Sequence, residues 1–147
     1  MRVGLLFLHI LGAAGWLGGG LFGAFAYPAV ARSGPPAAAG ILAVFEKRGG
    51  AYFGVTSGLV LLSGIGLVIT SDAFGWTDTF VLIGLGAFLL SGIIQSTVGG
   101  RANKHLAAAA ESGTGIDEAV SSWRQISLVD IAVLLVVVWS MVTKLGA

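Results

Sequence analysis

Charged residues along this 147-residue chain are spaced so that four long apolar stretches lie between them. Residues 3–31, 49–71 and 79–100 contain no charged residue when histidine is counted as neutral, and residues 125–143 contain one. Each stretch supplies the roughly 20 residues that a helix needs to cross a bilayer. The pattern therefore predicts an all-α protein with a single domain over residues 1–147. We expect a bundle of four transmembrane helices, at about residues 3–27, 49–70, 79–98 and 125–144.

The composition is typical of a membrane protein and excludes several classes of function. Hydrophobic residues make up 56% of the chain and charged residues 10%, with a mean hydropathy of +0.94, whereas a soluble domain carries about 25% charged residues. The net charge of +1 and the lack of any basic block argue against a nucleic-acid partner. Since there is no cysteine and only two histidines, disulfides, iron–sulfur clusters and all-histidine metal clusters are excluded.

Basic residues in the connections predict the orientation of the bundle. The first and third connections together carry six Lys or Arg residues, and the two termini with the second connection carry two. Because cytoplasmic loops are enriched in Lys and Arg, we expect both termini on the outer side. Short helical segments are expected in the cytoplasmic loops. Residues 101–112 predict a continuation of the third helix, and residues 37–48 predict either an interfacial helix or the first turns of the second span.

A histidine within the first span is the main candidate for chemistry. Ionisable residues inside a membrane are costly and often functional, and His9 shares a helix face with Trp16, two turns along. A neutral imidazole is a good ligand for iron or copper, and the small residues Gly12 and Ala13 would allow a flat ligand to approach the backbone. The alternative is a structural histidine that is hydrogen-bonded to the neighbouring helix, with Trp16 in ordinary packing. His105 is expected in the cytoplasm, so a second haem ligand would be Met141 or a residue of another subunit, or the position would be empty.

Polar residues form a second candidate group near the predicted cytoplasmic side. Tyr52, Gln95 and Asp130 lie on the second, third and fourth spans at similar depth. A relay for protons or cations and an interhelical hydrogen bond are both compatible with these residues.

Glycines at four-residue spacing predict where the first two spans approach each other. Such spacing places small residues on one helix face, which allows close helix packing in membranes. The two series are Gly15, Gly19 and Gly23 in the first span, and Gly50, Gly54 and Gly58 in the second.

The segment LHILGAAGWLGGGLF, residues 8–22, resembles the first helix of the CopD-like membrane superfamily. That superfamily includes the membrane domain of CopD copper-resistance proteins and HemJ-type protoporphyrinogen oxidases, and its signature corresponds here to His9, Trp16, Gly18 and Gly19. The resemblance implies a multi-pass protein of the bacterial inner membrane that binds haem b through His9. Copper binding is less favoured than haem binding, because the chain has only two methionines and two histidines.

The leading functional hypothesis is therefore a small membrane protein that uses haem b for electron transfer or haem handling. Two alternatives remain open: a non-catalytic accessory or scaffold subunit, and a small oligomeric transporter or channel. Four helices form a thin bundle, so we expect a homo-oligomer or a place in a larger membrane complex.

Overall fold

The computed structural model describes residues 1–35 and 37–144, and in this part of the chain the regular structure is entirely helical. Four of its helical segments are long and apolar enough to cross a membrane, so the predicted all-α fold with four helices of membrane-spanning length is confirmed. The elements are α1 (Arg2–Ala31), α2 (Ala37–Ile69), α3 (Thr79–Ile94), the π-helical turn η1 (Gln95–Gly99), α4 (Gly100–Ser112) and α5 (Ile116–Thr143).

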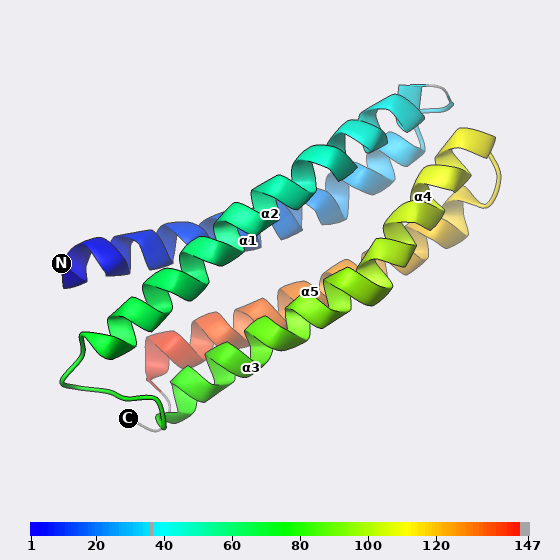
Figure 1. Ribbon diagram of the computed structural model, residues 1–147. Coiled ribbons are helices and arrows are strands. Elements are labelled where there is room, and N and C mark those ends of the chain that lie inside the picture. Colours follow the sequence, from blue (N-terminus) through cyan, green and yellow to red (C-terminus); the bar gives the residue numbers. More distant parts are fainter. Residues whose placement is uncertain (36, 145–147) are drawn as a thin grey trace.

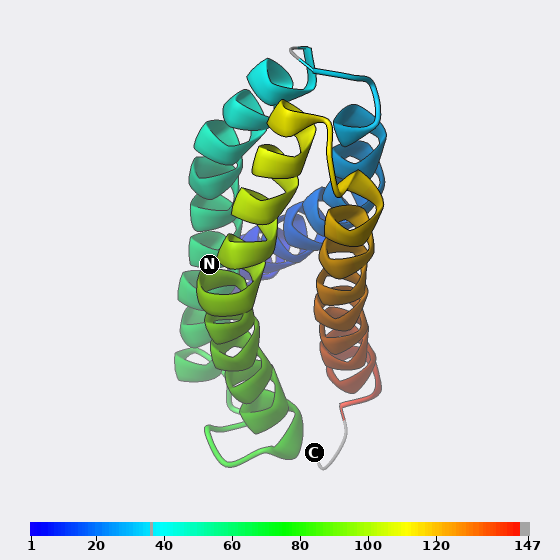
Figure 2. The same ribbon diagram turned by 90° about the vertical axis from the view of Figure 1, so that its right-hand side faces the viewer.

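The helices form an antiparallel bundle of two hairpins (Figures 1 and 2). One hairpin is α1 with α2, and the other joins the continuous rod α3–η1–α4 to α5. The N-terminus, the α2–α3 connection and the end of α5 lie at one end of the bundle, here called the terminal end (Figure 1). The α1–α2 and α4–α5 connections lie at the opposite end, here called the α4 end. The assignment of the terminal end to the outer side of the membrane remains a prediction from the loop charges.

Helix boundaries differ from the predicted spans mainly at the α4 end. The first span is predicted to end near residue 27, whereas α1 continues through Pro28 to Ala31. Proline removes only one amide donor there, and the carbonyl of Pro28 accepts from the amide of Arg32, the residue that caps the end of α1. Residues 37–48 are the first turns of α2, not a separate interfacial helix. The expected continuation of the third span over residues 101–112 is confirmed as α4.

The best-buried core lies at the α4 end and is made largely of small side chains. Leu106 is fully buried there, and the amphipathic α4 presents its apolar face to the other helices while its charged residues are exposed. Small residues let helix backbones approach closely. The cluster consists of Ala31, Ala38, Leu42, Leu106, Ala109, Ala110, Ala119 and Val120.

The two hairpins are joined unevenly along the bundle. Helix α1 packs against α2 and α5, α5 packs against α3 and α4, and α2 packs against α4. Among the described residues, the backbones of α2 and α3 do not approach each other closely. In the most apolar window of each span, only 11–28% of the residues are fully buried within the chain, so the bundle has a small core of its own in these segments.

Candidate functional site

His9 lies in the terminal half of α1, half-buried against α2. Its Nδ1 atom is 3.0 Å from the carbonyl oxygen of Val60 and 3.3 Å from Oγ of Ser63. A carbonyl can only accept, so the bond to Val60 requires the hydrogen on Nδ1 and leaves Nε2 of the neutral ring with a free lone pair. The ring also rests on Gly64, where an added Cβ would lie 3.1 Å from Cε1 of His9. Glycine at position 64 therefore makes room for the imidazole.

Gly12 and Ala13 lie about one helical turn after His9 on α1, and α2 packs directly against Gly12. A Cβ at Gly12 would lie 3.0 Å from the carbonyl oxygen of Thr56 and 3.0 Å from side-chain atoms of Leu59 and Val60. Consequently, a porphyrin plane has no space on this face of Gly12 while the α1–α2 hairpin is closed. Ala13 is half-buried beside it.

Trp16 and Met141, the other two residues proposed for the cofactor site, make their contacts with α3. The buried Trp16 ring packs edge-on against Phe88, with ring centroids 5.5 Å apart. The Cε atom of Met141 lies over Gly84, 2.6 Å from where a Cβ would stand. His9 and Gly12 thus contact α2, whereas Trp16 and Met141 contact α3, and the proposed cofactor residues face two different helices.

Tyr52 belongs to the α1–α2 interface and takes no part in a polar cluster with Gln95 and Asp130. Its hydroxyl donates to the carbonyl of Gly15 at 2.7 Å, and its ring lies over Gly19. The predicted close packing of the glycine series is therefore right for Gly15 and Gly19. It is wrong for the remaining members, because an added Cβ would meet nothing within 4 Å at Gly23, Gly50, Gly54 or Gly58.

Asp130 is 4% exposed and receives hydrogen bonds from two side chains of the facing rod. The Oγ of Ser91 donates to Oδ1, and Nε2 of Gln95 donates to Oδ2 at 2.9 Å. Gln95 is the first residue of η1, and π turns of this kind often occur at functional sites. Both carboxylate oxygens have a partner, which is the arrangement expected of an interhelical hydrogen bond.

A small cavity adjoins this pair. Its volume is about 40 Å³, and its lining includes Gln95, Trp123, Ser127 and Asp130. A water molecule needs roughly 10–15 Å³ of such space and two or more polar partners, so the cavity has room and hydrogen-bonding groups for water.

Two features of the bundle were not expected from the sequence. Ser91 was not assigned to the polar group, although it lies one helical turn before Gln95 and therefore on the same face. The second feature is an aromatic stack. The ring of Tyr27 lies between those of Phe45 and Trp123, with centroid distances of 5.3 Å and 4.9 Å. Trp123 Nε1 donates to the carbonyl of Gly23 at 3.2 Å. This stack joins α2, α1 and α5.

Over residues 1–35 and 37–144, no three His, Asp or Glu side chains come together in a way that could hold a metal ion. A metal bound through His9 would therefore need further ligands from a cofactor, from water or from another chain. No protein-family model, curated protein or solved structure matches this chain.

Proposed function

We propose that this chain is a multi-pass membrane protein that binds haem b through Nε2 of His9 and serves electron transfer or haem handling. The observation that carries the proposal is the hydrogen bond from Nδ1 of His9 to the carbonyl of Val60. Histidines that ligate metals commonly donate their other ring N–H to a carbonyl or carboxylate, which fixes the tautomer and the orientation of the ring. The donor chemistry of His9 therefore fits an axial ligand.

The surroundings of His9 indicate how such a group would be held. Because α2 covers Gly12, the porphyrin would lie outside the α1–α2 contact, against the exposed apolar side chains of the terminal half of the bundle. Such a site is incomplete within one chain, so we infer that a second subunit supplies the opposite wall. When bound, the haem supplies reversible one-electron transfer; the chain supplies a ligand of fixed tautomer and an apolar environment.

Absorption spectroscopy of the purified protein tests this proposal. Wild-type protein from haem-replete cells should show a Soret band, and His9→Ala should abolish it. His105→Asn is the matched control, because the second histidine is exposed on α4 and should not affect the spectrum. Imidazole added to His9→Ala should restore part of the band. Colourless wild-type protein whose spectrum does not change on addition of haemin would refute the proposal.

A second candidate, an accessory or scaffold subunit, is favoured by a different observation. His9 of α1 donates to a carbonyl of α2, and Tyr52 of α2 donates to a carbonyl of α1. These two reciprocal hydrogen bonds are sufficient to give both side chains a structural role.

The variant His9→Asn separates the two candidates. An asparagine amide retains a donor for the carbonyl of Val60 but is a poor iron ligand. If His9 is a ligand, His9→Asn should lose the Soret band while keeping the thermal stability of haem-free wild type. If His9 is only structural, wild-type protein should be colourless, and the larger loss of stability should occur in His9→Ala.

A further inference from the structure

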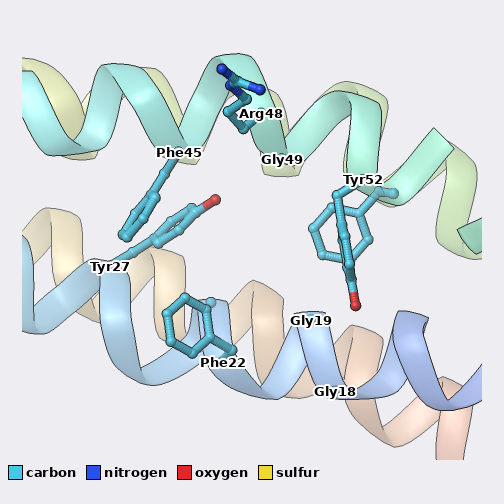
Figure 3. A pocket seen from close by; sticks show the side chains of 10 residues that line it. Gly18, Gly19, Phe22, Tyr27, Phe45, Arg48, Gly49 and Tyr52 are labelled. Carbon is cyan, nitrogen blue, oxygen red and sulfur yellow. The ribbon is translucent and has the colours of Figure 1, made fainter. Parts of the chain in front are cut away.

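A groove of about 360 Å³ lies between α1 and α2, away from His9. Its volume is within the roughly 300–1,000 Å³ that is typical of small-molecule sites. Aromatic rings and glycines form most of its walls, with one cationic residue (Figure 3). The residues are Gly18, Gly19, Phe22, Gly23, Tyr27, Phe45, Arg48, Gly49, Tyr52 and Phe53.

Aromatic side chains bound the groove at both ends, and glycine keeps it open. Figure 3 shows Tyr27 and Phe45 together at one end and Tyr52 at the other, with α1 and α2 as the two long sides. A Cβ added at Gly18 would meet nothing within 4 Å. Phe22 is 62% exposed, so the groove opens to the surroundings of the bundle. In a chain that spans a membrane, these surroundings are lipid.

Charge and depth indicate the kind of lipid. Arg48 is the last charged residue before the uncharged stretch 49–71, which places its guanidinium near the level of the headgroups. From Tyr27 to Gly18 the groove runs about 13 Å along α1 into the apolar region, at 1.5 Å per residue.

The local charge at this level is positive. Residues 46–48 comprise one carboxylate, Glu46, and two cations, Lys47 and Arg48, for a net charge of +1. The ion pair found among the described residues joins Arg32 to Asp117, so Arg48 is not neutralised by a salt bridge in this part of the chain.

We propose that this groove binds an anionic phospholipid, with an acyl chain between the aromatic rings and the phosphate paired with Arg48. A guanidinium matches two phosphate oxygens with a pair of parallel hydrogen bonds. Basic pockets between transmembrane helices are known to select anionic headgroups in this way. The inference depends on the membrane-spanning fold and is independent of any role for His9.

Native mass spectrometry of the protein in detergent tests the site, with phosphatidylglycerol and phosphatidylcholine of identical acyl chains as probes. Wild type should retain phosphatidylglycerol preferentially. Arg48→Gln should reduce that retention about tenfold, the effect of losing one charge-assisted interaction. Gly18→Leu should fill the groove and reduce retention of both lipids. Gly86→Leu on α3 is the matched control, since Gly86 is also an exposed helical glycine with no atom within 4 Å of an added Cβ.

Several outcomes would overturn the proposal. Equal retention of the two lipids by wild type would show that charge plays no part. Retention unaffected by both Arg48→Gln and Gly18→Leu would show that lipid binds elsewhere. A dimer that dissociates in Gly18→Leu but not in Gly86→Leu would identify a second copy of the chain as the occupant. Helical circular dichroism equal to wild type would establish that each variant is folded.

Discussion

Gly19 is the glycine of α1 with the least room for a side chain, and its replacement by alanine should destabilise the hairpin. The new Cβ would lie 2.5 Å from Cε1 of Tyr52, so the ring must move. It cannot move freely, because its hydroxyl is bonded to the carbonyl of Gly15 at 2.7 Å. Overpacking costs about 1–3 kcal/mol, and loss of the hydrogen bond adds about 1 kcal/mol.

Helix propensity acts in the opposite direction. Alanine is favoured over glycine within a helix by up to about 1 kcal/mol. The expected net loss for Gly19→Ala is therefore about 1–3 kcal/mol. Gly18→Ala gains the same propensity without a clash, since nothing lies within 4 Å of its Cβ, and it should be as stable as wild type or slightly more stable.

Thermal unfolding in detergent, followed by circular dichroism, measures these effects in a double-mutant cycle. If the clash acts through the Tyr52 ring, Gly19→Ala should be neutral or slightly stabilising in a Tyr52→Ala background, which gives a coupling energy of about 2–4 kcal/mol, the overpacking and hydrogen-bond contributions together. Equal stability of Gly19→Ala and Gly18→Ala would refute the proposed clash with Tyr52. The clash would also be refuted if the loss caused by Gly19→Ala is the same with and without the tyrosine.

Three further predictions concern other parts of the bundle. Asp130→Ala removes the acceptor of two donors, one of them the buried hydroxyl of Ser91, and we expect a loss of about 1–3 kcal/mol in thermal unfolding; wild-type stability would show that the interhelical bonds contribute nothing. Gly113 has a φ of +71° in the α4–α5 turn, so Gly113→Ala should cost about 1–2 kcal/mol, whereas Gly86→Ala, in open helix surface, should not destabilise. For orientation, a cysteine at exposed Thr114 should react with an impermeant maleimide only after the membrane is permeabilised, and one at Asp72 should react from outside; the reverse result would invert the topology.

The number and nature of the helices followed from the sequence because the membrane imposes a strong pattern. An uncharged stretch of about 20 residues has few alternatives to a transmembrane helix, and all four such stretches are helical in the structure. The boundaries were less accurate because α1 continues through Pro28 to the end of its uncharged stretch and α2 begins before its own. Both α1 beyond residue 27 and α2 before residue 49 extend into segments whose small residues pack in the core at the α4 end.

Contacts between helices were only partly predictable, because spacing gives the face of a helix but not its neighbour. His9 and Trp16 share a face by spacing, yet one contacts α2 and the other α3. The arrangement of the bundle determines the neighbours of each residue, because a helix face that lies between two other helices contacts both of them. Depth grouped Gln95 with Asp130, and these two are hydrogen-bonded, but it also grouped them with Tyr52, which bonds to the backbone of α1 instead.

The uneven joining of the two hairpins bears on the proposed haem. The buried cluster and the aromatic stack hold α1, α2, α4 and α5 together at the α4 end, whereas the backbones of α2 and α3 do not approach each other closely in the described part of the chain. His9 belongs to the α1–α2 hairpin and Met141 contacts Gly84 of the other hairpin, so a ligand held by both would have to bridge the hairpins. A second subunit that presented its own His9 would need no such bridge. We therefore expect haem binding and oligomerisation to be coupled. The dimer fraction seen by cross-linking in membranes should rise with haem supply in wild type and stay constant in His9→Asn.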